Sequence, residues 1–160
     1  MKLKFLSAFF FLLAITTLVA MDDAPFSPVT SSAPLTSAEL RDKTVAYVDF
    51  MKLVGRSNKE EEYSPQIPVM FSIDCTKVIN NNIAYETLDG VLPQFIGVKE
   101  KVGTWTMEYL HIFTDPDQQA STVYLKWQSE KLEGPYVTIA ILKFNLHGQI
   151  TLIDEVFNKI

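Results

Sequence analysis

The chain has 160 residues, of which 48% are hydrophobic and 21% charged, and its formal net charge is −5. An acidic chain repels phosphate backbones, and the two arginines, Arg41 and Arg56, belong to no basic cluster, so nucleic acid is excluded as an expected partner. The length fits one domain with a sizeable core. The lone cysteine, Cys75, cannot form a disulfide within the chain, and its apolar neighbours predict a buried thiol.

Residues 1–20 have the pattern of a secretory signal peptide. Lys2 and Lys4 precede an uncharged, mostly apolar run from Phe5 to Ala20, and a small residue ends it. The alternative is an uncleaved membrane anchor, but a spanning helix needs about 20 apolar residues and this run is shorter. We therefore predict an exported protein, periplasmic or secreted, with no membrane association after cleavage. Cleavage there removes two lysines and no acid, so the formal charge becomes −7.

The predicted domain covers residues 36–160, after a leader at 21–35. The leader carries three prolines among small and polar residues, a composition that predicts disorder. Thr36 and Glu39 have capping-box spacing ahead of an apolar-periodic segment, so a helix is expected to begin there. Gly55 would suit the end of that helix.

Three shorter elements are expected in the middle of the chain. Residues 64–71, with prolines near the start, favour a short helical turn. Residues 74–86 favour two strands that turn at Asn80–Asn82, because asparagine tolerates left-handed backbone. Residues 87–103 carry an apolar stripe at helical spacing, and Gly103 closes that helix.

From Gly103 onward the apolar period changes from helical to two. The alternation predicts four long strands joined by short turns, the last turn at His147-Gly148, which together form an antiparallel meander. These strands are expected at 104–113, 121–132, 136–145 and 150–158. Helices followed by a run of strands predict an α+β domain, in which the N-terminal helices pack on one face of a curved antiparallel sheet.

The first of these strands places five bulky side chains on one face, by strict alternation: Trp105, Met107, Tyr109, His111 and Phe113. Aromatic side chains at period two usually belong to the core. Two alternatives stay open for Trp105, Tyr109 and Trp127, namely stacking on a ligand inside the fold and a sheet-to-sheet dimer surface.

Three segments carry a resemblance to a known superfamily. They are "MFSIDCTKVINN" from Met70, "VGTWTMEYL" from Val102 and "LKFNLHGQITLIDEVFN" from Leu142. In this order they resemble the nuclear transport factor 2-like superfamily, which includes SnoaL-like polyketide cyclases, ketosteroid isomerase and limonene epoxide hydrolase. The resemblance covers about residues 36–160. It implies a cone-shaped, cystatin-like roll with the helices in the concave face of the sheet and a pocket for a mostly apolar ligand at the open end.

The catalytic sets of two members of that superfamily are not matched. The resemblance puts the aspartate base of ketosteroid isomerase near Val78–Ile79 and its aspartic acid donor near Ala140, and none of these side chains transfers a proton. For limonene epoxide hydrolase, Asn80 matches the asparagine and Glu155 would replace the last aspartate. Its tyrosine position is Val78, however, and the predicted sheet has no arginine.

The remaining acid–base candidates are His111, Glu108 and Glu155. His111 is either a general base or a hydrogen-bonded core or rim histidine. The two glutamates line either the pocket or the outer sheet. Asp154 and Glu155 alternate on the last strand, so at most one of them points into the cone, and strand-edge solubility is the preferred interpretation of both. Two histidines without acids at ligand spacing predict no metal site, and no cofactor motif is present.

The main hypothesis is an exported, non-catalytic domain that binds an apolar small molecule or a protein partner. The alternative is a SnoaL-like enzyme, an isomerase, cyclase or hydrolase, with acid–base residues in the cone pocket. A third possibility is a homodimer through the sheet face. The residues predicted to line the pocket are Tyr47, Asn80, Trp105, Tyr109 and Trp127.

Overall fold

The computed structural model describes residues 33–160. The predicted signal peptide and residues 21–32 of the predicted leader lie outside the described residues. Leu35, the last leader residue, packs against the core, and its backbone is held by the side-chain amide of Gln119, which accepts from Leu35 N at 2.8 Å and donates to Leu35 O at 3.1 Å. Within residues 33–160, no helix is both long enough and apolar enough to cross a membrane.

The first helix, α1 (Ser37–Arg56), begins where the capping box predicts. The Thr36 hydroxyl accepts from Glu39 N at 3.3 Å, and the Glu39 carboxylate accepts from Thr36 N at 2.8 Å, so two free backbone donors are paired. The prediction that Gly55 ends the helix is wrong, because α1 continues to Arg56. A Cβ on Gly55 would lie 2.6 Å from the indole nitrogen and the carbonyl oxygen of Trp105, so glycine is needed there for close approach of strand to helix.

The other predicted elements are present, with short 3-10 helices between some of them. Asn80 and Asn81 have φ values of 49° and 64°, which confirms the left-handed turn between the first two strands. The elements after α1 are η1 (Glu60–Glu62), η2 (Ser64–Gln66), α2 (Ile67–Met70), β1 (Phe71–Ile79), β2 (Asn82–Tyr85), η3 (Leu88–Gly90), α3 (Val91–Val102), β3 (Trp105–Asp115), β4 (Ala120–Ser129), β5 (Tyr136–Phe144) and β6 (Ile150–Lys159).

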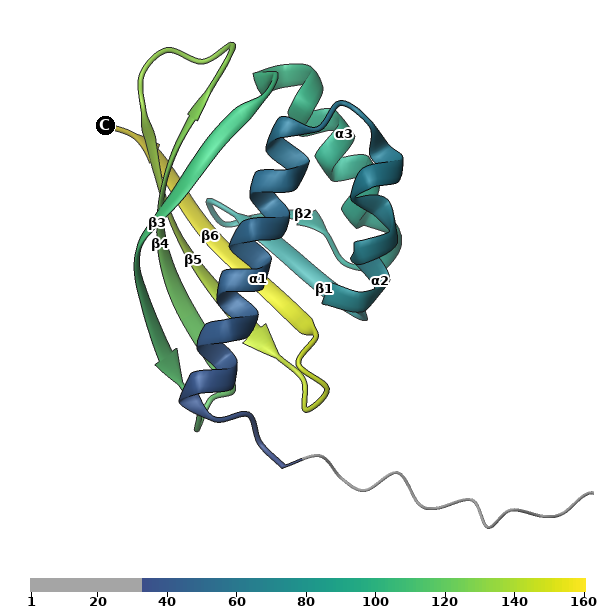
Figure 1. Cartoon of the computed structure of the whole chain (residues 1–160), viewed down its shortest axis with the longest axis vertical. Coiled ribbons are helices and arrows are strands. Elements are labelled where there is room, and N and C mark those ends of the chain that lie inside the picture. The colour runs from purple at the N-terminus through teal and green to yellow at the C-terminus, as the bar shows by residue number, and fades with distance from the viewer. Residues whose placement is uncertain (1–32) are drawn as a thin grey trace, which may run out of the picture. The chain divides into compact units, whose positions relative to one another are not determined.

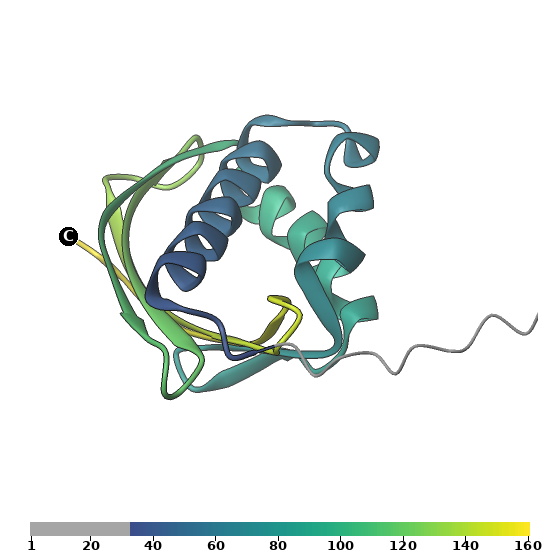
Figure 2. The ribbon, with the colours of Figure 1, turned by 60° about the horizontal axis from the view of Figure 1, so that its bottom comes forward.

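The six strands form one sheet in the order β2-β1-β6-β5-β4-β3. The antiparallel meander from β3 to β6 confirms the prediction, and the domain is α+β with its helices on the concave side of a curved sheet. β1 joins the meander by pairing parallel to β6, a contact that no sequence pattern indicated. Figures 1 and 2 both show α1 between the curved strands β3–β5 and the helix α3.

A β-bulge in β3 changes which side chains face the helices. Tyr109 pairs with Leu125 and His111 with Tyr124, which leaves Leu110 without a partner in the register. The extra residue shifts the alternation by one. The prediction that β3 keeps one bulky face from Trp105 to Phe113 is therefore wrong beyond the bulge, because His111 and Phe113 are exposed and Ile112 packs against the core.

The core lies between α1, α3 and the concave face of the sheet. Phe50 contacts both Phe71 and Phe95 edge to face, with ring centroids 5.7 Å apart in each pair. Cys75 is buried in this core, as predicted. Beside these packed side chains, the concave face of the sheet borders a cavity.

Candidate ligand-binding cavity

A cavity of about 320 Å³ lies between α3 and the concave face of the sheet. Its volume is at the lower end of the range of about 300–1,000 Å³ that small-molecule pockets occupy. Most of the wall is apolar, and its side chains from α1, α3, β3 and β4 include Met51, Phe95, Val98, Trp105, Met107 and Leu125. Such a wall favours the apolar part of a ligand.

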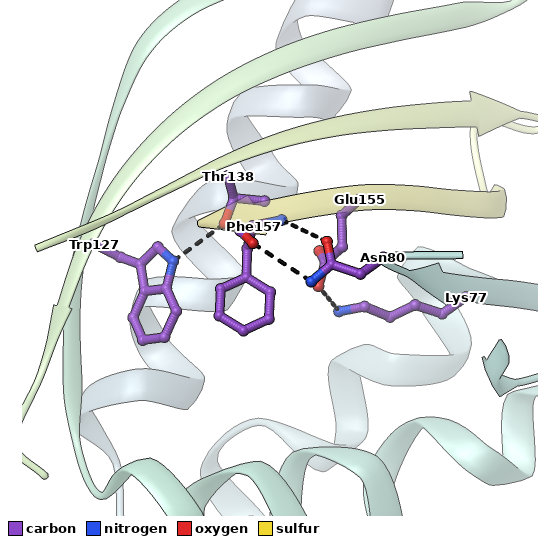
Figure 3. A network of polar contacts seen from close by, with 6 residues as sticks. All are labelled: Lys77, Asn80, Trp127, Thr138, Glu155 and Phe157. Carbon is purple, nitrogen blue, oxygen red and sulfur yellow. Dashed lines mark hydrogen bonds and ion pairs between the residues drawn. The ribbon is translucent and has the colours of Figure 1, made fainter. Parts of the chain in front are cut away.

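Cross-strand pairing places the sheet part of this wall. Met107 is directly opposite Trp127, and Thr138 is directly opposite Phe157. Because residues opposite each other in an antiparallel pair share a face, all four side chains point to the concave side. Trp127 Nε1 donates to Thr138 Oγ1 at 3.1 Å, so the polar atom of the indole is paired inside the fold (Figure 3). The ring of Trp127 therefore presents apolar surface to the cavity.

A buried ion pair forms the main polar feature of the cavity. Lys77 Nζ on β1 lies 3.1 Å from Glu155 Oε1 on β6, and the two side chains are only 4% and 14% exposed (Figure 3). Both residues line the cavity. A charge in a dry interior is costly unless a partner neutralises it, so each of these groups requires the other.

No motif of the sequence predicts Lys77 as a site residue. The resemblance puts the superfamily's catalytic base near Val78–Ile79, one or two residues farther along β1. A usable signal was present, because Cys75, Lys77 and Ile79 alternate at period two and the two flanking residues are apolar. That alternation assigns Lys77 to the inner face. Ile79 lines the cavity and Ala140 is buried opposite Glu155, so both superfamily positions are inside but apolar.

Two further polar groups line the cavity. Gln94 Oε1 on α3 is buried and has no hydrogen-bond partner within residues 33–160. The phenol of Tyr47 is fully buried, and burial together with the negative charge of Glu155 holds the pKa of this phenol well above its usual value. Tyr47 therefore stays protonated and keeps its hydrogen-bond donor at neutral pH.

Of the residues predicted to line a pocket, Tyr47, Trp105 and Trp127 line the cavity. Asn80 has a structural partner instead: its amide donates to Phe157 O at 3.4 Å and accepts from Phe157 N at 3.1 Å, which ties β1 to β6. Tyr109 lies on the edge strand, is 38% exposed, and has Lys52 Nζ 6.0 Å from its ring centroid.

The three acid–base candidates lie in different places. Glu155 points into the cavity and the adjacent Asp154 is exposed, so one acid of the pair faces inward. The interpretation of Glu155 as a residue of the exposed strand edge is therefore wrong. Glu108 is exposed and lies 3.8 Å from Lys126 Nζ. His111 is exposed beyond the bulge. Neither Glu108 nor His111 is near the ion pair, and residues 33–160 contain no cluster of metal-ligating side chains.

The convex face of the sheet carries a second group of apolar side chains. Two rows cross the strands, one from His111 through Tyr124 and Ile139 to Val156, the other from Phe113 through Thr122 to Ile141. The apolar members Phe113, Ile139, Ile141 and Val156 are exposed. We call these four residues the outer patch. Contiguous apolar surface of this kind marks interaction sites.

Comparison with known proteins rests on structure, because no protein-family model and no curated protein matches the chain in sequence. A protein of Jannaschia sp. CCS1 described as a SnoaL-like polyketide cyclase has a TM-score of 0.64 at 5% identity, over 76% of this chain and 87% of that one. The M. tuberculosis epoxide hydrolase of the limonene epoxide hydrolase-like type has 0.60 at 11%, over 76% and 84%. A nuclear transport factor 2-like protein of unknown function from Exiguobacterium sp. 255-15 has 0.58 at 14%, over 76% and 99%. The described domain therefore has the nuclear transport factor 2-like, SnoaL-like fold that the sequence resemblance implies.

Proposed function

We propose that this protein is an exported, non-catalytic domain that binds a small apolar molecule in the cavity between α3 and the sheet. The observation that carries the proposal is a 320 Å³ space with mostly apolar walls. The resemblance puts the base and the acid donor of ketosteroid isomerase near Val78–Ile79 and Ala140, and none of these side chains transfers a proton. Export follows from the signal-peptide pattern of residues 1–20.

Binding is tested with the neutral fluorescent probe N-phenyl-1-naphthylamine. We expect saturable fluorescence enhancement with the wild-type domain. Val98→Trp on α3 fills the cavity and abolishes the enhancement, whereas the control Glu100→Trp puts the same side chain on an exposed position of the same helix and leaves it intact. Equal binding by both variants places the probe elsewhere and contradicts the proposal.

Export is tested separately. The full chain expressed in a Gram-negative host is expected in the periplasmic fraction, with an N-terminus near residue 21 by mass spectrometry. Recovery of the intact chain from the membrane fraction supports the uncleaved anchor instead.

An enzyme of the SnoaL-like type is the alternative, and the position of Glu155 is the observation that favours it. A carboxylate in an apolar cavity, beside a cation that holds it in place, has the geometry of a general base. The two functions differ in the effect of Glu155→Gln. A binding domain keeps its affinity for the neutral probe, whereas an enzyme keeps binding but loses turnover of its substrate.

The outer patch supports a second proposal, that two copies of the domain pair through the convex face of the sheet. Sheets pack face to face through rows of apolar side chains, and the patch crosses the central strands of the meander. A second copy presents the same patch, so the contact is self-complementary. The cavity opens on the opposite face of the sheet, and pairing therefore leaves it accessible.

A further inference from the structure

The polar groups of the cavity have unused hydrogen-bonding capacity of two kinds. An ammonium group has three donors, and within residues 33–160 Glu155 is the only ion-pair partner of Lys77. Gln94 Oε1 is an acceptor that is buried without a donor. Leaving a buried acceptor unpaired costs about 1–3 kcal/mol, so a ligand hydroxyl that reaches this oxygen through a rotation of the half-buried Gln94 side chain gains affinity.

The charges of the cavity select against ionised ligands. Lys77 and Glu155 neutralise each other, so a ligand carboxylate brings a third charge close to Glu155 in a poorly solvated space, and a ligand ammonium does the same beside Lys77. The third charged residue of the wall, Lys101, is exposed and its charge is screened by water. The interior of the cavity thus favours a polar group without net charge.

We propose that the ligand has an apolar body and a neutral hydroxyl group, an alcohol or phenol, whose oxygen accepts from Lys77 and whose hydrogen is donated to Gln94. A hydroxyl is the simplest neutral group that supplies both an acceptor and a donor. This inference deepens the proposed function and rests on it. It names the chemical class of the ligand from the ion pair and the unpaired amide oxygen, neither of which was identified from the sequence.

Three naphthalenes of nearly equal size test it by displacement of N-phenyl-1-naphthylamine at pH 7: 2-naphthol, 2-naphthoate and 2-methylnaphthalene. For the wild-type domain we expect 2-naphthol to bind about tenfold tighter than either of the others, the ratio that one good hydrogen bond supports. This ranking needs no variant and is independent of any folding defect. 2-Naphthoate binding as tightly as 2-naphthol, or the two neutral compounds binding equally, overturns the inference but leaves the proposed function standing. Failure of all three to displace the bound probe also overturns the inference, whereas equal probe binding by the Val98→Trp and Glu100→Trp variants removes the proposed function itself.

Three variants test which residues cause the preference for 2-naphthol. Gln94→Met is expected to weaken 2-naphthol binding severalfold without changing that of 2-methylnaphthalene, and the hydrogen bond from Lys77 keeps 2-naphthol the tighter of the two. Glu155→Gln leaves the Lys77 charge without a partner, so the preference is expected to turn toward 2-naphthoate. Lys59→Met is the matched control, because Lys59 is exposed and does not line the cavity, so its replacement leaves the ranking unchanged. A reversal with Lys59→Met, or none with Glu155→Gln, contradicts the assignment to the buried pair.

Discussion

Lys77 and Glu155 lie on the first and last strands of the chain, yet their charged atoms are 3.1 Å apart inside the cavity. The contact exists because β1 pairs parallel to β6, with Ile79 in register with Glu155. Parallel neighbours bring inward-facing residues of both strands to the same wall. The register is held by the amide of Asn80, which pairs with the backbone of Phe157.

Removing one member of this pair is expected to destabilise the fold strongly. Lys77→Met leaves Glu155 as an uncompensated buried carboxylate, which lowers the free energy of unfolding by about 3 kcal/mol. Lys77→Met combined with Glu155→Leu restores stability to within about 1 kcal/mol of the wild type, because the second change removes the unpaired charge. Urea unfolding measures both. Asp154→Asn, on the same strand but exposed, is the control and changes stability by less than about 0.5 kcal/mol. Equal losses for the single and double variants contradict a paired role.

Two glycines are expected to respond oppositely to alanine. A Cβ on Gly97 in α3 meets no atom within 4 Å, so Gly97→Ala raises stability by about 0.5–1 kcal/mol through the smaller entropy loss of folding. A Cβ on Gly55 meets Trp105 at 2.6 Å, so Gly55→Ala forces strand and helix apart and lowers stability by about 1–3 kcal/mol. Thermal unfolding of the two variants measures both changes in stability. A loss at Gly97 or a gain at Gly55 contradicts the packing described for these helices.

The proposed dimer is expected to depend on the outer patch. Ile139→Lys puts a charge at its centre and is expected to convert a dimer to a monomer, because a charge buried in an apolar interface lacks a partner. Light scattering after size exclusion measures the mass. Ile83→Lys is the matched control, since Ile83 is 63% exposed on β2, away from the patch, and its replacement leaves the mass unchanged. A monomeric wild-type domain at micromolar concentration removes the dimer proposal.

Cys75 is expected to be unreactive in the folded protein and to weaken it at high pH. Burial raises the pKa of its thiol from 9.0 to about 11, so a thiol reagent at pH 8 reacts slowly with the folded domain and at once in denaturant. Between pH 9 and 11 the unfolded chain releases this proton while the folded chain retains it, so stability is complete below pH 9 and falls as pH rises.

The contribution of the thiol is isolated by comparison with Cys75→Ala. Tyr47 and Tyr85 also have raised pKa values because of burial, so both proteins lose stability in alkali. The wild type is expected to show the steeper fall between pH 9 and 11 in denaturant titrations. Parallel pH profiles contradict a buried, protonated Cys75.

Much of the fold follows from local patterns in the sequence. The capping box at Thr36, the left-handed turn at Asn80 and Asn81, the closing Gly103 and the period-two strands were all predicted, because each depends on backbone preferences within a few residues. The cavity residues Tyr47, Trp105 and Trp127 were proposed from the aromatic pattern and the resemblance, and the wall of the cavity contains all three.

What the sequence by itself determined is therefore the order of elements, their turns and the α+β class, since propensities and periodicities act over short separations. Only the tertiary structure decided the parallel contact of β1 with β6, the bulge at Leu110 and the close approach of Gly55 to Trp105. Each joins segments far apart in the chain, and each register depends on the packing of the whole domain. These long-range contacts place Lys77 in the cavity and leave His111 exposed.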